Sequence, residues 1–121
     1  MKITKITVIL LAIAGLSAAA FAANLEPAEQ IETRQAGYKF MSWNMKKIKA
    51  NLEGNYSQAA VQGAANAIAG IANSGMGALY GPGTDKAIGD VQTRVKPELF
   101  TEREEVGRVA RNFIEAANDL V

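Results

Sequence analysis

The chain has 121 residues, of which 49% are hydrophobic and 21% are charged, and its formal net charge is +1. This composition is typical of one small globular domain rather than a disordered chain, and the near-neutral charge gives no reason to expect nucleic acid as a partner. The sequence contains no cysteine and no histidine, so it offers no disulfide, no thiolate or imidazole metal ligand and no histidine general base.

Residues 1–22 have the pattern of a secretory signal peptide. Two lysines precede an apolar run over residues 6–19, and a small-x-small cleavage site ends at Ala22. The alternative is a retained membrane anchor, because the uncharged stretch before Glu26 is long enough to span a bilayer. The cleavage site and the many alanines favour removal. We therefore expect a helical-bundle domain over residues 23–121 that is exported, in a bacterium to the periplasm, and has no membrane association after cleavage.

The longest predicted helix runs from about Gln30 to Leu52, with Pro27 in its first turn and Gly54 at its end. A seven-residue repeat along it is typical of a helix that packs against other helices. Arg34 is the one cation in this repeat, and it either snorkels out at the end of a bundle or meets an anionic ligand between helices. The repeat comprises Ile31, Tyr38, Met45 and Leu52, with Arg34, Met41 and Ile48 three residues after the first three.

A second helix is predicted from Gln58 to Leu79, with Ser57 as its N-cap and a weak point at Gly75-Met76-Gly77. Its apolar face carries small side chains that allow a neighbouring helix to approach closely. We interpret this face as core, and a subunit interface is the alternative. The face consists of Val61, Ala64, Ala65, Ile68, Ile71, Ala72 and Met76.

A long loop is predicted over residues 80–96, because Gly81-Pro82-Gly83 cannot continue a helix. A loop of this length in a small domain is usually functional or disordered, and this one must wrap over the bundle. Helix is predicted to restart at Pro97, with Thr101 and Glu104 as a capping box. The apolar stripe of this third helix consists of Val106, Val109, Phe113, Ala116, Ala117 and Leu120.

Three motifs, in order and in register over residues 24–121, resemble those of the cytochrome c prime family. The resemblance implies an all-α fold, an antiparallel four-helix bundle of which this chain carries three helices. It also implies a homodimer and a covalently held haem c in the bundle core. The motifs are Ile31-x-x-Arg34-Gln35-x-x-Tyr38-x-x-Met41 in the first helix, Leu79-Tyr80-Gly81-Pro82-Gly83-Thr84 in the loop and Lys96-Pro97-Glu98-Leu99-Phe100 before the third helix.

The resemblance further implies which residues bind the cofactor. Arg34 and Gln35 would lie at the haem propionates, because a guanidinium pairs well with a carboxylate. Tyr38 would face the open side of the iron, where small gases enter, and Met41 would line the pocket. Two residues outside the first helix complete the expected site, Thr93 near the haem edge and Phe100 in place of the family's tryptophan.

The chain departs from the family pattern at the haem attachment. The family attaches haem through Cys-x-x-Cys-His on its fourth helix, and this sequence has neither residue type. It is therefore either a truncated cytochrome or a haemless descendant, and the apolar pattern that still runs, uncapped, at Val121 favours truncation. We expect no catalytic residue, no metal ligand and no enzymatic activity.

Two functions follow from these alternatives. The first is a periplasmic haem protein for electron transfer or small-gas binding, inactive as it stands and served by an unidentified periplasmic redox partner. The second is a haemless periplasmic helical binding or scaffolding protein.

Overall fold

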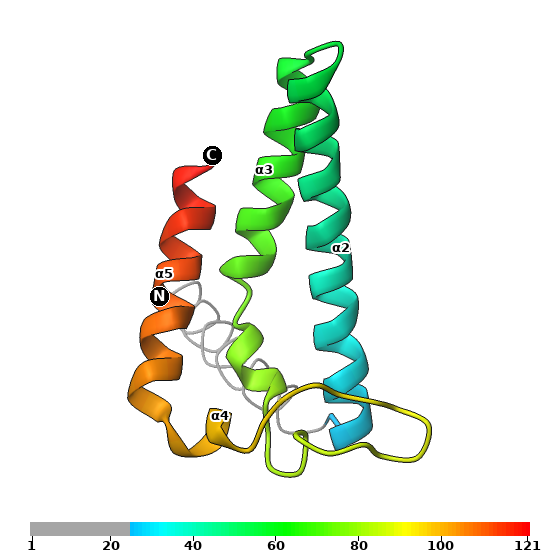
Figure 1. The fold of residues 1–121 in the computed structure, drawn as a ribbon, viewed down its shortest axis with the longest axis vertical. Coiled ribbons are helices and arrows are strands. Elements are labelled where there is room, and N and C mark those ends of the chain that lie inside the picture. The colour runs from blue at the N-terminus through cyan, green and yellow to red at the C-terminus, as the bar shows by residue number, and fades with distance from the viewer. Residues whose placement is uncertain (1–24) are drawn as a thin grey trace, which may run out of the picture.

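The computed structural model describes residues 25–121, and the predicted signal peptide lies outside this range. In this part of the chain, no helix is both long enough and apolar enough to cross a membrane. Three long helices stand side by side, with α3 between α2 and α5 (Figure 1). The elements in order are α2 (Pro27–Glu53), α3 (Gln58–Ala72), the 3-10 helix η1 (Met76–Leu79), α4 (Glu98–Thr101) and α5 (Arg103–Asp119).

The predicted first helix is confirmed as α2. Pro27 occupies its first position, the backbone N–H of Glu26 donates to the Glu29 carboxylate at 3.1 Å, and Gly54 ends the helix. Only part of the predicted seven-residue repeat is buried, because α3 covers one side of α2. The buried residues are Ile31, Arg34, Met41, Asn44 and Ile48, whereas Tyr38, Met45 and Leu52 are exposed.

Ser57 is the N-cap of α3 as predicted, and its hydroxyl accepts the N–H of Ala60 at 3.3 Å. The interpretation of the small-residue face as core is also confirmed, since Ala64 is fully buried and Ala65 is almost so. Alanines at these positions let α2 and α3 pack closely along their length. The shared core cluster comprises Met41 and Ile48 of α2, Ala64, Ile68 and Ala72 of α3, and Ala117 of α5.

The predicted extent of the second helix is wrong, because α3 ends at Ala72 rather than at Leu79. The side chain of Asn73 bonds back to the Ala69 carbonyl at 2.7 Å, which competes with continuation of the helix. Gly75 then adopts a φ of 84°, a left-handed conformation that glycine tolerates. After this break the chain re-forms only the short 3-10 helix η1.

The long loop before α4 is confirmed, and it passes around the N-terminal end of α2 before it returns to α4 (Figure 1). A tight turn in this loop pairs Ile88 with Val91 through two backbone hydrogen bonds of 2.9 and 3.0 Å. Gly89 in the turn has a φ of 57°. Residues 80–97 are thus folded against the helices and form one wall of the cavity described below.

The predicted capping box at Thr101 and Glu104 is wrong. Thr101 is the last residue of α4, and its hydroxyl bonds to the Glu98 carbonyl within that helix. Glu102 leaves the helical conformation with φ −93° and ψ 54°, and α5 begins after it without a side-chain cap. The hydroxyl that would cap α5 is therefore used by the preceding turn.

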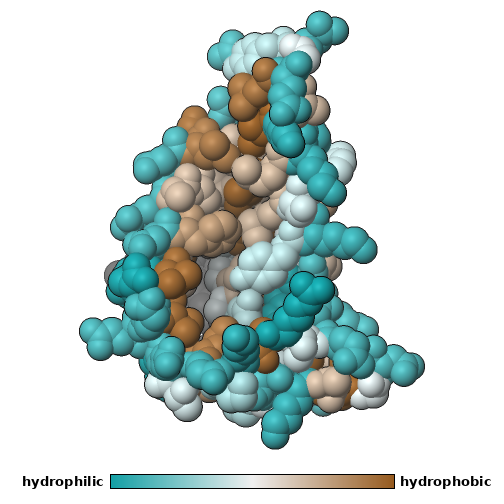
Figure 2. All heavy atoms as spheres, in the orientation of Figure 1, coloured by the Kyte–Doolittle hydropathy of each residue, from teal (hydrophilic) through white to brown (hydrophobic). Residues whose placement is uncertain are grey.

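The predicted apolar stripe of α5 is only partly buried. Ala117 is 4% exposed, but Val109 and Phe113 are 54% and 40% exposed. Among the described helices, α5 packs mainly against α3, and apolar residues that do not face α3 remain exposed. Figure 2 shows the result, a hollowed face lined by apolar residues between α5 and the α2–α3 pair.

Candidate functional site

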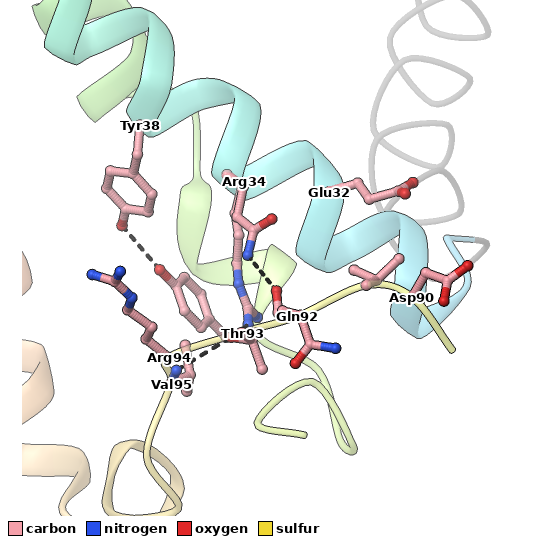
Figure 3. Close-up of a pocket in the computed structure, with 11 residues that line it drawn as sticks. Glu32, Arg34, Tyr38, Asp90, Gln92, Thr93, Arg94 and Val95 are labelled. Carbon is pink, nitrogen blue, oxygen red and sulfur yellow. Dashed lines mark hydrogen bonds between the residues drawn. The ribbon is translucent and has the colours of Figure 1, made fainter. Parts of the chain in front are cut away.

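A cavity of about 850 Å³ lies between the N-terminal half of α2 and the loop that wraps around it (Figure 3). This volume is within the roughly 300–1,000 Å³ of small-molecule pockets. The cavity combines charged, amide and phenolic groups, which suit a ligand with a polar edge. Its lining consists of Glu32, Arg34, Gln35, Tyr38, Tyr80 and residues 90–95.

Arg34 is the most deeply buried polar residue of the cavity, at 2% exposure. Its guanidinium donates to the carbonyls of Leu79 at 3.0 Å and Thr84 at 2.5 Å, and to the Thr93 hydroxyl at 3.0 Å. The snorkelling interpretation of Arg34 is therefore wrong, because the loop folds over the side chain and supplies oxygen acceptors. These bonds use three of its five N–H donors.

The Arg34 guanidinium also lies over the ring of Tyr80, with its carbon 4.4 Å from the ring centroid. This is a cation–π geometry. Burial lowers the pKa of Arg34, while the nearby phenols of Tyr80 and Tyr38 oppose this shift. Because an arginine pKa starts so high, the side chain stays charged and gives the cavity a fixed positive group.

Two tyrosines meet at the cavity. The hydroxyls of Tyr38 on α2 and Tyr80 after η1 are 3.0 Å apart, as the dashed line in Figure 3 shows. Tyr38 is 45% exposed, whereas Tyr80 is partly buried. Burial raises the pKa of Tyr80 well above its usual range, and the hydrogen bond with Tyr38 raises it further. Tyr80 therefore stays neutral and keeps its proton.

The opposite wall of the cavity is held to α2 by Gln35. Its amide nitrogen donates to the Gln92 carbonyl at 2.6 Å, which leaves its second N–H and its oxygen available. Thr93 accepts from Arg34 and also from the backbone N–H of Val95 at 3.2 Å. Arg94 is exposed, extends toward the side of the cavity where Tyr38 lies (Figure 3), and forms no ion pair within residues 25–121.

The structure places the six expected cofactor-binding residues in two groups. Met41 lies in the hydrophobic core at 6% exposure, and Phe100 is partly buried on α4, so neither lines the cavity. The other four come together around it, and they are Arg34, Gln35, Tyr38 and Thr93.

Seven of the eleven residues that line the cavity were not predicted from the sequence, and Tyr80 and Arg94 are among them. Tyr80 belongs to the loop motif, but its aromatic ring gave no sign that it would stack on Arg34. Arg94 follows Thr93 directly. Exposed and partly buried residues alternate along this stretch, and Arg94 is one of the exposed ones. An aromatic residue and a cation at the two ends of a long loop were the available signals.

Comparison with known proteins identifies the family. Residues 29–121 match the family model described as cytochrome C′. The chain belongs to the cytochrome c′ family. It is 70% identical over 106 residues to the cytochrome c′ of Allochromatium vinosum, a match that covers 88% of this chain and 69% of that protein. It is 44% identical over 99 residues to the cytochrome c′ of Rhodocyclus tenuis, covering 78% of this chain and 74% of that one.

Solved structures of the cytochrome c′ family have the same fold. The crystal structure of cytochrome c′ from Thermochromatium tepidum matches with a TM-score of 0.75 and 67% identity over 78% of this chain and 73% of that one. A cytochrome c′ described as having an unusual ligand-controlled dimer dissociation matches with a TM-score of 0.77 and 72% identity, over 78% and 72% of the two chains. The expected all-α bundle of the cytochrome c prime type is confirmed.

The residues of this chain fit part of a haem c, the cofactor of the cytochrome c′ family. Arg34 and Gln35 have N–H donors for the propionates, and Tyr38 presents a phenol to the cavity. The attachment chemistry does not fit, because the 121 residues include no cysteine and no histidine. Within residues 25–121, no group of three or more acidic, cysteine or histidine side chains is placed to hold a metal ion.

Proposed function

We propose that this chain is a periplasmic haem protein of the cytochrome c′ type, a kind of protein that serves in electron transfer or small-gas binding rather than in catalysis, and that these 121 residues are inactive without the haem-attachment segment. The observation that carries the proposal is the convergence of Arg34, Gln35, Tyr38 and Thr93 on one cavity. Family membership supports the cofactor, and the signal-peptide pattern that ends at Ala22 supports export to the periplasm.

Each cavity residue has a role that its free hydrogen-bonding groups allow. The two unused N–H groups of Arg34 and the second amide N–H of Gln35 would bind the propionate carboxylates. Tyr38 would present its hydroxyl to the open face, and Thr93 would fix the cavity edge. Haem in this cavity would supply the iron for redox and gas-binding chemistry.

The lack of cysteine and histidine sets the form of the bound state. Haem held by these 121 residues alone has no thioether bond and no imidazole ligand. We therefore expect weak, non-covalent binding and no activity as an electron carrier. A homodimer is part of the proposal, supported by the relative whose dimer dissociation is ligand-controlled. A periplasmic redox partner completes it.

A second candidate is a haemless periplasmic helical binding or scaffolding protein. One observation favours it: the cavity residues satisfy one another, since Arg34 finds three acceptors in its own chain. In residues 25–121, no buried side-chain nitrogen or oxygen lacks a hydrogen-bond partner. The buried polar groups of these residues therefore find their partners without a cofactor.

Absorption spectroscopy decides between the two candidates. The full-length coding sequence is expressed with the haem-attachment machinery present, and the purified protein is examined for a Soret band. The haem proposal predicts a band that acid–acetone extraction removes and that Arg34→Met weakens. Arg108→Met is the matched control, because Arg108 lies on the exposed face of α5 and pairs only with Glu105. A protein without any Soret band contradicts the haem proposal and favours the scaffold.

A further inference from the structure

Tyr80 has contacts on two sides that no role discussed above requires. Its hydroxyl is 3.0 Å from that of Tyr38, and its ring lies under the Arg34 guanidinium at 4.4 Å. Tyr80 therefore touches both the buried cation and the exposed phenol of the cavity. Through these two contacts, Tyr80 fixes the position of the Tyr38 hydroxyl relative to the Arg34 guanidinium.

The backbone around Tyr80 is anchored as well as its ring. Arg34 donates to the carbonyl of Leu79, the residue directly before Tyr80, at 3.0 Å. The backbone N–H of the following residue, Gly81, donates to the Gln30 side chain at 2.9 Å. Tyr80 is thus clamped to α2 on both sides along the chain. Tyr38, by contrast, is 45% exposed, and its hydroxyl has no hydrogen-bond partner other than Tyr80 among the described residues.

Either hydroxyl of the pair can donate this hydrogen bond, because a phenol has one O–H donor and also accepts through its oxygen. Tyr80 is the more buried phenol, and both its burial and its bond to Tyr38 raise its pKa. Beyond its bond to Tyr80, the Tyr38 hydroxyl keeps hydrogen-bonding capacity that a ligand in the cavity can use.

We propose that Tyr80 is a positioning residue, whose hydrogen bond with Tyr38 holds the Tyr38 hydroxyl in the cavity, where it can bond to a ligand. The role for Tyr38 at the open face of a haem rests on the proposed function. The positioning itself does not, because it is a property of the protein without any ligand.

The test uses the small number of tyrosines, which are Tyr38, Tyr56 and Tyr80. Protein produced from the full-length gene is labelled with ¹³C at the tyrosine Cζ atom, whose NMR shift reports hydrogen bonding and ionisation of the hydroxyl. Tyr80→Phe keeps the ring over Arg34 and removes only the hydroxyl. We expect it to move the Tyr38 resonance to the position of a solvated tyrosine while the Tyr56 resonance stays in place. Tyr56 is the internal control, because it is 62% exposed and lies between α2 and α3.

An unchanged Tyr38 resonance in folded Tyr80→Phe protein overturns the proposal. If circular dichroism shows that this variant does not fold, Tyr38→Phe takes its place, because removing an exposed hydroxyl leaves the core intact. In that variant the pH titration of the Tyr80 resonance must shift to lower pH, since two of the causes that raise the Tyr80 pKa come from Tyr38. A Tyr80 titration that stays where it is in the parent protein refutes the hydrogen bond.

Added haemin separates this inference from the proposed function. A lost neutral hydrogen bond corresponds to about 2- to 10-fold in affinity, so Tyr80→Phe should weaken haemin binding by that factor. If the parent protein binds no haemin, the haem proposal fails and the NMR result still decides the role of Tyr80. If haemin binds and the Tyr38 resonance is insensitive to Tyr80→Phe, the positioning role fails and the haem proposal stands.

Discussion

Replacement of Arg34 by methionine tests how much of this fold depends on one buried cation. Methionine keeps an unbranched side chain of similar length but has no donor for the three oxygens that the guanidinium contacts. The carbonyl of Thr84, a fully buried residue, would lose its hydrogen bond from Arg34. Residues 80–95 would lose two of their five hydrogen bonds to α2, and the bonds to Gln30, Gln35 and Tyr38 would remain.

The size of the effect follows from these contacts. Each hydrogen bond to a charged group contributes about 1.5–3 kcal/mol, and leaving a buried acceptor unpaired costs about 1–3 kcal/mol. The contributions are not additive, and removal of a buried charge recovers part of its desolvation free energy. We therefore expect Arg34→Met to lower the free energy of unfolding by about 3–5 kcal/mol. That is a large share of the roughly 5–15 kcal/mol available to a small domain.

Urea denaturation followed by circular dichroism measures this loss. The matched control is Arg108→Met, which removes an arginine that pairs only with Glu105 on the exposed surface of α5. The control should leave the denaturation midpoint unchanged, because surface pairs of this kind contribute little. A loss below about 1 kcal/mol for Arg34→Met would refute the reasoning, since one buried and two partly buried charge-assisted bonds should together contribute more.

Three further changes probe other parts of the structure. Met41→Ala should lower the free energy of unfolding by about 2–5 kcal/mol, because Met41 is 6% exposed. Met45→Ala on the same helix is the control and should have little effect, since Met45 is 52% exposed. Gly81→Ala should lower the free energy of unfolding by about 1 kcal/mol, because the new Cβ would lie 2.7 Å from the Gln30 amide oxygen and would break the hydrogen bond from the Gly81 N–H to that oxygen. Urea denaturation measures the effects of Met41→Ala and Gly81→Ala. The raised pKa of Tyr80 means that its proton binds more tightly in the folded state, so the stability that it contributes is complete below the ordinary tyrosine value of 10.0 and is lost as the pH rises above it. Alkaline unfolding of Tyr80→Phe should therefore depend less steeply on pH than that of the parent protein, and equal pH dependence would contradict the assignment.

The helices could be predicted from the sequence wherever local signals and packing agree. α2 has proline in its first turn, a seven-residue repeat and a glycine at its end, and its predicted extent is confirmed. α3 was predicted too long, because the apolar pattern continues to Leu79 while the Asn73 side chain bonds back to the helix and ends it. Periodicity reports which residues are apolar, but it does not report a side chain that competes for a backbone carbonyl.

The cavity could be predicted only in part. The resemblance to the family gave six site residues, of which four line the cavity, and two of these, Arg34 and Gln35, are neighbours on α2. The partners of Arg34 could not be predicted, because two of the three are backbone carbonyls, which every residue has. Contacts across 45 to 59 residues depend on the path of the loop, and no local pattern in the sequence specifies that path.

The position of Arg34 explains why a cation is tolerated between helices in so small a domain. A buried guanidinium is unfavourable unless acceptors surround it. Here the wrapped loop supplies two acceptors, Thr84 and Thr93, and Leu79 at the end of η1 supplies the third. The same bonds hold the loop, so the order of residues 80–95 and the burial of Arg34 depend on each other. An anionic ligand that required the N–H groups already bonded to the loop would have to displace it. The loop therefore limits how a carboxylate can approach Arg34, and it does so through the Thr84 carbonyl and the Thr93 hydroxyl.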